Sequence, residues 1–292
     1  QERNFGFHRV ERLEGNVGYL DIRYFASPRD ALDTATAAMA FLENTDALIF
    51  DMRENGGGHP GMVHFLCSYL FEERTHLNSF YYREGDRTED YWTLPGVPGK
   101  KMSDVPVYVL TSPKTFSGAE EFSYNLRTRK RGTLVGETTR GGANPGNTFS
   151  INEQLEVFIP IGRAINPVTG TNWEGTGVKP HVSVTAGGAL TLALDMARPA
   201  AAEYRAAKEA LWDALDDAYM GAVRLQDLNK PADAERVLTA GLMAAIEARI
   251  LDERGVETLG QDLVRSGRET LGSCALKLKA KVFPKEEESE GQ

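Results

Sequence analysis

The sequence predicts an α/β domain followed by an all-helical region, and three observations lead to this fold class. Segments with strand-like and helix-like patterns alternate over residues 1–184, an order typical of α/β proteins. Residues 200–283 are dominated by Ala, Leu, Glu, Lys and Arg and carry helical periodicity. The 292 residues suffice for one large domain or two smaller ones. We therefore predict a core domain at 1–190, a helical region at 191–284 and a disordered acidic tail at 285–292.

The first half of the core domain is predicted to contain two strands and two helices. Val17–Tyr24 is the first strand, and an alanine-rich amphipathic helix follows over Pro28–Asn44 with Ser27 as its N-cap. Ala47–Asp51 is a continuous apolar run, typical of a strand that is covered on both faces. A turn of three glycines then leads into a helix predicted over Pro60–Glu73.

The second half of the core domain continues the alternation. Tyr81–Leu94 is aromatic and charged without clear periodicity, and we interpret it as a strand plus a loop. Leu134–Gly136 is predicted to be a strand, and a glycine-rich loop follows at 141–147. A hairpin is expected over Thr148–Ile161, and Pro180–Val184 is the closing strand.

The helical region is interrupted at Asn229–Pro231, Gly255 and Gly267, which divides it into about four helices. The restarts after these breaks weakly resemble the helix hairpins of tetratricopeptide repeats. Because two degenerate units fall below the number that such repeats need, plain helical packing is the preferred interpretation.

Composition and charge exclude several classes of protein. The net charge of −9 and the pI of about 5.2 argue against nucleic acid or an anionic membrane as the main partner. Cys67 and Cys274 form neither a disulfide framework nor a CxxC motif, and no cluster of His, Cys, Asp or Glu has metal-ligand spacing. We therefore expect no metal and no cofactor. No apolar run is long enough for a membrane span, and no signal peptide is present. Because the sequence begins with Gln1, we expect that an upstream segment has been cleaved or trimmed.

The strongest functional signal is Thr115–Phe122, directly after the apolar run Val105–Leu110. A β-rich run, a turn with a small residue and a helix-forming stretch together lift a serine hydroxyl to the positive end of a helix. Ser117 is therefore the candidate nucleophile. Gly118 follows it and would supply one backbone N–H to a developing oxyanion.

Two further segments carry candidate chemistry. The run that ends in Gly57 and Gly58 leaves a buried strand, and glycines allow a backbone to approach a ligand closely. Alone it would be an ordinary flexible turn, but together with Ser117 it predicts the second oxyanion donor. Glu174 follows a tryptophan among glycines, and it either orients a base, binds a substrate amine or is simply solvated.

Four segments together resemble the S41 peptidase family: Asp51–Gly58, Thr111–Phe122, Gly136–Thr139 and Glu174–Pro180. That family includes carboxyl-terminal processing proteases, tricorn core proteases and interphotoreceptor retinoid-binding modules, and the texture is most similar to the retinoid-binding-like branch. The resemblance covers about residues 5–184. It implies a crotonase-like (ClpP/crotonase) spiral of ββα units, with Ser117 as nucleophile and oxyanion donors from Gly118 and the Gly57–Gly58 turn.

The sequence departs from this family at the catalytic base. The lysine of the processing proteases aligns with Gly142, which excludes a Ser–Lys dyad on this alignment, and Lys114 is interpreted as a solvated turn residue. The tricorn-like branch uses a histidine assisted by a glutamate, which Glu174 matches. Because that histidine comes from a domain before the core, we expect it outside this chain. His59, beside the glycine turn, is the candidate base within the chain.

The other four histidines (His8, His64, His76 and His181) border predicted core strands or flank the helix after the glycine turn. There is also no room for a PDZ-like insert between the first two predicted strands, so the grip that processing proteases use on a substrate tail is missing.

The preferred function is a serine peptidase of the S41 class, which acts on a peptide or polypeptide through an acyl-enzyme on Ser117 with Glu174 assisting. The alternative is a non-catalytic module that binds a hydrophobic ligand such as a retinoid or fatty acid, in a cleft lined by Phe80, Tyr81, Tyr82 and Trp92. An acyl-CoA enzyme of the crotonase type is a third, less favoured hypothesis. The resemblance also implies an extracytoplasmic location, and a homo-oligomer stays open.

Overall fold

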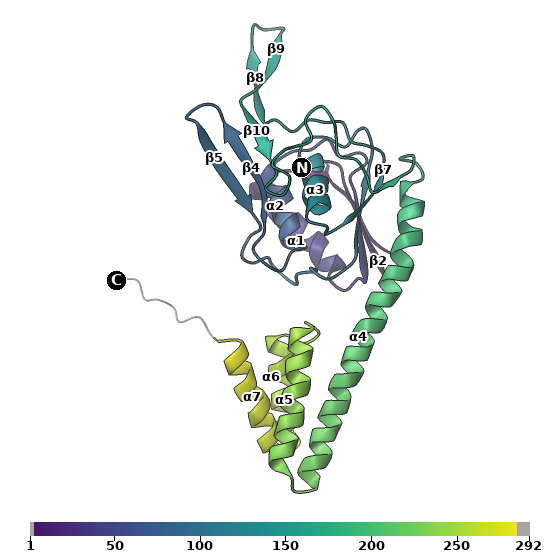
Figure 1. The fold of residues 1–292 in the computed structure, drawn as a ribbon, viewed down its shortest axis with the longest axis vertical. Coiled ribbons are helices and arrows are strands. Elements are labelled where there is room, and N and C mark those ends of the chain that lie inside the picture. Colours follow the sequence, from purple (N-terminus) through teal and green to yellow (C-terminus); the bar gives the residue numbers. More distant parts are fainter. Residues whose placement is uncertain (1–2, 285–292) are drawn as a thin grey trace, which may run out of the picture. The chain divides into compact units, whose positions relative to one another are not determined.

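The computed structural model describes residues 3–284, in two compact units that join at Tyr204 and Arg205 (Figure 1). The predicted acidic tail at 285–292 lies outside the described residues. None of the described helices is long and apolar enough to cross a membrane.

The first unit is built on a six-stranded sheet with the order β1-β2-β3-β6-β7-β11. β1 and β2 are antiparallel, and every later pair in the sheet is parallel. The strands are β1 Phe7–Leu13, β2 Val17–Ile22, β3 Ala47–Asp51, β6 Val107–Thr111, β7 Thr133–Gly136 and β11 Val182–Ser183. β2, β3 and β6 are buried along their whole length, which explains why β3 and β6 appear in the sequence as apolar runs.

Helices cover both faces of this sheet. α1 (Pro28–Leu42), α2 (Pro60–Ser68) and α3 (Gly118–Thr128) pack on the face that carries Leu48 and Phe50. The opposite face packs against the start of α4, the helix Ala189–Asp227, through the alanines at 189, 193, 197 and 201. Small side chains every fourth residue let this helix approach the sheet closely.

A second sheet in this unit has three antiparallel strands, in the order β10-β4-β5. Its strands are β4 His76–Tyr82, β5 Arg87–Trp92 and β10 Gly162–Ile165, and a separate ribbon pairs β8 Gly146–Ser150 with β9 Glu156–Pro160. Residues 81–94 therefore contain the end of β4, a turn, the whole of β5 and a short loop, so the predicted strand plus loop is confirmed in part, and the hairpin that begins at His76 was missed. Periodicity failed here because aromatic side chains such as Tyr82 and Tyr91 are only half-buried and alternate with charged residues.

Other boundaries differ in detail from the predictions. The second helix ends at Ser68 rather than Glu73, because the chain turns at Tyr69 and the carbonyl of Leu70 accepts a hydrogen bond from Arg131. Ser27 occupies the N-cap of α1, but its side chain makes no capping hydrogen bond.

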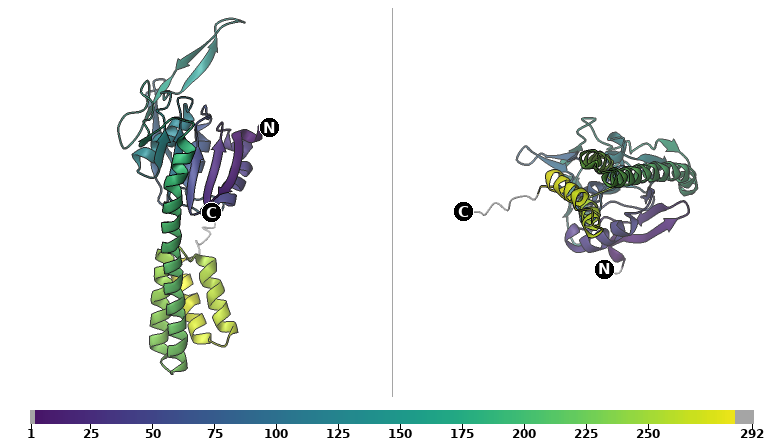
Figure 2. Two further views of the ribbon diagram at one scale, coloured as in Figure 1. Left: turned by 90° about the vertical axis from the view of Figure 1, so that its right-hand side faces the viewer. Right: turned by 90° about the horizontal axis from the view of Figure 1, so that it is seen from below.

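The second unit consists of the end of α4 with α5 Pro231–Glu247, α6 Glu253–Arg265 and α7 Glu269–Val282 (Figures 1 and 2). Leucine and alanine side chains form its core, as the helical periodicity predicts. The predicted break at Gly255 is wrong: this residue lies in the first turn of α6, where its N–H donates to the N-cap Asp252. A mixed α/β core followed by C-terminal helices is confirmed.

Candidate active site

Ser117 occupies a strained turn between β6 and α3. Its backbone has φ 52° and ψ −118°, in the positive-φ region that non-glycine residues rarely adopt. This is the conformation expected of a serine lifted onto a sharp strand-to-helix turn. The side chain is partly exposed at the N-terminus of α3, where the helix dipole favours negative charge.

The glycine turn after β3 packs directly against Ser117. β3 and β6 are neighbouring parallel strands, so the loops at their carboxyl ends meet at the same edge of the sheet. A Cβ on Gly57 would lie 2.7 Å from the Cβ of Ser117 and 2.9 Å from the nitrogen of Gly118. A Cβ on Gly118 would lie 3.3 Å from the nitrogen of Gly58. Two segments about 60 residues apart thus form one site, and only glycine fits at their contact.

Two backbone N–H groups at this contact are available to a ligand. Within residues 3–284, neither Gly58 nor Gly118 donates its N–H to a protein acceptor. The N–H of Gly57, in contrast, donates to the buried Asn55 side chain at 2.8 Å. Of the two glycines predicted in this turn, Gly58 is therefore the one that can serve as an oxyanion donor, and Gly57 provides the close approach.

The buried Glu120 joins the Ser117 turn to the loop after β7. Its carboxylate is fully buried and accepts hydrogen bonds from four donors: the backbone N–H groups of Ser117 (2.9 Å), Gly141 (2.6 Å) and Gly142 (2.8 Å) and the hydroxyl of Thr139 (2.5 Å). Hydrogen bonds to an ionised acceptor are about twice as strong as neutral ones. Glu120 therefore holds both the backbone of Ser117 and the adjacent loop.

Glu174 holds the next part of the same loop. One of its carboxylate oxygens accepts hydrogen bonds from the N–H groups of Ala143 (2.7 Å) and Asn144 (3.0 Å). The neighbouring Trp173 donates its indole N–H to the carbonyl of Gly142 at 3.1 Å. Glu174 is exposed and makes no direct contact with Ser117 among the described interactions. Its observed hydrogen bonds are to the backbone of the loop at Ala143 and Asn144.

His59 is the N-cap of α2, where its Nδ1 accepts the N–H of Gly61 at 3.0 Å. This contact fixes Nδ1 as an acceptor and leaves the proton of a neutral ring on Nε2. His64, His76 and His181 are hydrogen-bonded to Glu121, Ser79 and the N–H of Leu134. Among the described residues, no histidine or lysine side chain is hydrogen-bonded to Ser117.

The aligned lysine position is closed by an aromatic ring. A Cβ on Gly142 would lie 2.2 Å from a ring carbon of Phe116, and the guanidinium of Arg140 covers this ring at 4.7 Å. Lys114 forms an exposed ion pair with Glu54 at 2.9 Å, as expected of a solvated turn residue. A side chain at position 142 would therefore collide with the Phe116 ring as it lies in this structure.

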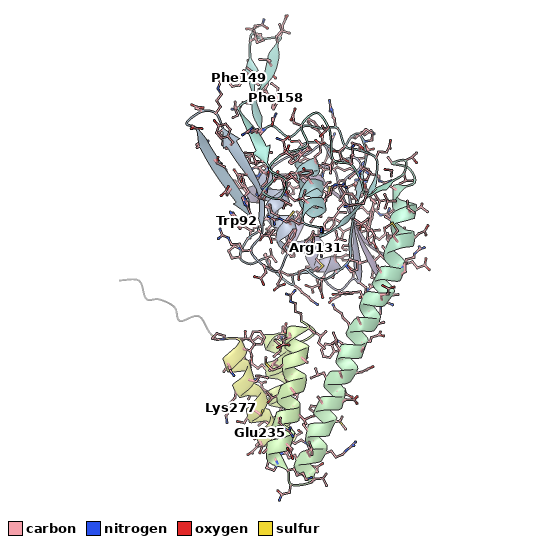
Figure 3. The ribbon with its side chains drawn as sticks, in the orientation of Figure 1. Trp92, Arg131, Phe149, Phe158, Glu235 and Lys277 are labelled. Carbon is pink, nitrogen blue, oxygen red and sulfur yellow. The ribbon has the colours of Figure 1, made fainter. Side chains whose placement is uncertain are left out.

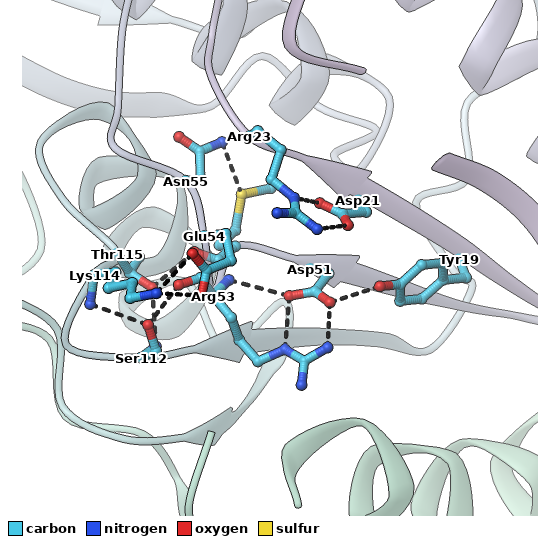
Figure 4. A network of polar contacts seen from close by, with 11 residues as sticks. Tyr19, Asp21, Arg23, Asp51, Arg53, Glu54, Asn55, Ser112, Lys114 and Thr115 are labelled. Atoms are coloured by element: carbon cyan, nitrogen blue, oxygen red, sulfur yellow. Dashed lines mark hydrogen bonds and ion pairs between the residues drawn. The ribbon is translucent and has the colours of Figure 1, made fainter. Parts of the chain in front are cut away.

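A buried ion pair anchors the strand that leads into the glycine turn (Figure 4). Arg53 contacts both carboxylate oxygens of Asp51, at 2.9 and 2.6 Å, and Tyr19 donates its hydroxyl to the same carboxylate at 2.6 Å. Burial by itself would raise the pKa of Asp51, but the hydrogen bonds from Arg53 and Tyr19 outweigh it and the pKa is lowered. The carbonyl of Arg53 also accepts the hydroxyl of Ser112 at 2.5 Å, which ties the β3 loop to the β6 loop.

The sequence analysis assigned no role to Glu120, Asn55 or Arg53. For Glu120 a local signal exists, because a Glu three residues after a Ser is the capping-box pattern at a helix start. Asn55 and Arg53 lie in the segment that was singled out for its glycines, but their partners are known only once the strands are paired.

Comparisons with known proteins match most of the first unit to one peptidase family. A family model described as peptidase family S41 matches residues 16–184. A chloroplastic C-terminal processing peptidase of Tetradesmus obliquus is 28% identical over 173 residues, which are 58% of this chain and 35% of that protein. A structure described as an S41 protease of Bacteroides fragilis has a TM-score of 0.58 at 21% identity, over 65% of this chain and 57% of that one. Another, described as a peptidase of Parabacteroides merdae, has a TM-score of 0.51 at 23% identity, over 62% and 57%.

The likeness to the two solved structures shows a shared fold. The chain spans 35% of the length of the curated relative and 57% of each of the two solved chains.

Proposed function

The chain belongs to peptidase family S41, and on this premise we propose that it is a serine peptidase that cleaves a peptide or polypeptide through an acyl-enzyme on Ser117. The observation that carries the proposal is the pair of available N–H groups, on Gly58 and Gly118, beside a serine with strained backbone geometry. A spiral of ββα units, an extracytoplasmic location and an extended substrate belong to the same proposal.

In the proposed reaction, Ser117 Oγ attacks the carbonyl carbon of the scissile peptide bond and its proton passes to a base. The carbonyl oxygen gains negative charge, and the N–H groups of Gly58 and Gly118 donate hydrogen bonds to it. The amine takes up a proton and leaves, and water then releases the acyl group from Ser117. Removing one such donor costs about 10²–10³ in kcat in other hydrolases.

The mechanism also needs a base that takes the proton from Ser117 Oγ. We propose that a histidine outside this chain fills the role, with Glu174 assisting indirectly through the loop that it holds. His59 is the second choice, because its Nδ1 is committed to Gly61 while Nε2 keeps a proton. The first choice predicts weak activity for this chain alone.

Labelling with a serine-reactive fluorophosphonate tests the nucleophile. The wild-type chain should form an adduct on Ser117, and Ser117→Ala should form none. Digestion and mass spectrometry locate the adduct. If Ser117 stays unlabelled even after long incubation with excess probe, it is not an activated nucleophile.

The second candidate function is non-catalytic binding of a hydrophobic ligand. The lack of a base in hydrogen-bond contact with Ser117, among the described residues, favours it. The comparisons give no support to retinoid binding. Of the aromatic residues expected to line a cleft, Phe80 is a core residue that packs on Tyr91, and Trp92 is stacked against His76 (Figure 3). These two side chains already serve packing within the unit.

A further inference from the structure

The β8–β9 ribbon presents an apolar face to solvent. Residues directly opposite each other in an antiparallel pair share one face, and Phe149 pairs with Val157 in this ribbon. The pairs on either side place three more apolar residues on that face: Ile159 opposite Asn147, and Ile151 joined to Leu155 by a 2.8 Å backbone hydrogen bond. All five side chains are between 36% and 65% exposed.

The opposite face of the ribbon carries fewer apolar side chains, Phe158 and Pro160, beside the polar Thr148, Ser150 and Glu156. It carries Thr148 opposite Phe158 and Ser150 opposite Glu156, and the latter two are hydrogen-bonded at 3.3 Å. The ribbon is therefore amphipathic, like a strand pair that normally lies on a core, yet it extends away from the two sheets of its unit (Figures 1 and 2). An isolated two-stranded ribbon is at best marginally stable in water, so covering this face with a partner would stabilise it.

The size of the face argues for a transient partner rather than a second copy of the chain. The five exposed side chains present on the order of 400 Å², within the range of the largest, often functional, patches on monomers. Two copies packed face to face would bury about 800 Å² in total, below the roughly 1,200 Å² of a stable interface. A short extended segment of another polypeptide needs no larger area.

The root of the ribbon follows directly on the loop that Glu120 joins to the Ser117 turn. β8 begins at Gly146, directly after the loop that Glu120 and Glu174 hold by backbone hydrogen bonds. The carbonyl of Pro145 accepts the N–H groups of Ile161 and Gly162, which closes the root of the ribbon. A polypeptide bound on the ribbon would thus be connected to the Ser117 turn through this loop.

We propose that the apolar face of the β8–β9 ribbon captures an extended, apolar segment of a polypeptide substrate. The occupant's side chains at alternate positions would pack on Phe149 and Val157, and its backbone can pair with a free edge of the ribbon, because β8 and β9 pair only with each other in the described sheets. This inference rests on the proposed peptidase function and specifies its substrate class: unfolded polypeptides with apolar segments.

Binding of fluorescein-labelled β-casein, an unfolded polypeptide, tests the proposal in the Ser117→Ala chain, where cleavage cannot interfere. Fluorescence anisotropy should show saturable binding, and adding Phe149→Ser should weaken it about tenfold, equivalent to about 1.4 kcal/mol. The matched control is Phe158→Ser, the same change on the opposite face (Figure 3), which should stay within twofold. Both residues are exposed, so both variants should fold, and circular dichroism checks this.

Three outcomes overturn the proposal: no saturable binding of casein, equal losses for the two variants, or a shift from dimer to monomer in Phe149→Ser by sedimentation velocity. The last would assign the face to a second copy of the chain. Fluorophosphonate labelling of Ser117 should proceed at the same rate in chains with and without Phe149→Ser. If Ser117 is never labelled while casein binding still depends on Phe149, the capture surface stands and the peptidase function fails.

Discussion

Glu120→Gln is the substitution that most directly tests how the site is held together. The change keeps the shape of the side chain but replaces one acceptor oxygen with an NH₂ group. Glu120 faces four donors and has no donor to offer, so an amide satisfies at most the two donors at one end. The other end would place the NH₂ group against the N–H groups of Ser117 and Gly142, or against the N–H of Gly141, where the hydroxyl of Thr139 can turn to accept.

The expected loss follows from these contacts. A hydrogen bond to a charged acceptor contributes about 1.5–3 kcal/mol, and one or two donors are left without an acceptor in a fully buried position. Allowing for relaxation of the loop, we expect a destabilisation of about 3 kcal/mol. For a unit of this size 1 kcal/mol corresponds to about 2–4 °C, so the melting temperature should fall by roughly 6–12 °C. The backbone of Ser117 also loses its restraint, so fluorophosphonate labelling should slow.

Differential scanning calorimetry and the labelling rate together measure this effect. Glu54→Gln is the control, because Glu54 lies near the site but is exposed and pairs only with Lys114. Its effect should stay within about 0.5 kcal/mol. The assigned role of Glu120 would be refuted if the Glu120→Gln variant had a melting temperature within about 1–2 °C of the wild type and the same labelling rate, as the control does.

Two further predictions concern the glycine turn and the response to pH. Gly57→Ala places a Cβ 2.7 Å from the Cβ of Ser117 at a position with φ 99°, so it should destabilise the unit by about 2 kcal/mol and slow fluorophosphonate labelling. The control Gly56→Ala, at a position with open space and no positive φ, should change neither the melting temperature nor the labelling rate. Equal effects of the two variants would contradict the proposed contact. His181 accepts a backbone N–H through Nδ1, and burial followed by the charge of Arg127 lowers its pKa below 6.5. The unfolded chain therefore binds the proton more readily, and this contribution to stability should be lost as the pH falls from about 6.5 through the folded-state pKa. The melting temperature of the wild type should drop more between pH 7.5 and pH 5 than that of His181→Gln, and parallel curves would show that His181 does not contribute.

Local sequence patterns predicted much of the fold. Ala47–Asp51 was identified as a buried strand because four apolar residues precede Asp51 without a break. The structure has a strand with the same bounds. The turn before α3 was recognised because strand, small residue and helix follow each other within a few residues. The hairpin of β4 and β5 was missed, since its half-buried aromatic residues mask the alternation of a strand.

The candidate site was predicted as a set of residue types but not as a set of contacts. Ser117, Gly58 and Gly118 are brought together as the resemblance implied, while Glu174 acts on a loop and His59 caps a helix. The carboxylate of Glu120 was overlooked, because its four donors come from two segments of the chain and only folding brings them to one point.

The sequence by itself determined which groups could perform acyl transfer: a serine at a helix start, glycines that permit close approach, and no lysine at the aligned position. Only the tertiary structure decided which of these groups meet. The physical reason is the pairing of β3 with β6, since parallel neighbours place their carboxyl ends at one edge of the sheet and force the two following loops together. Which N–H stays available there, on Gly58 and not on Gly57, depends on a single side-chain contact from Asn55 that the order of residues does not reveal.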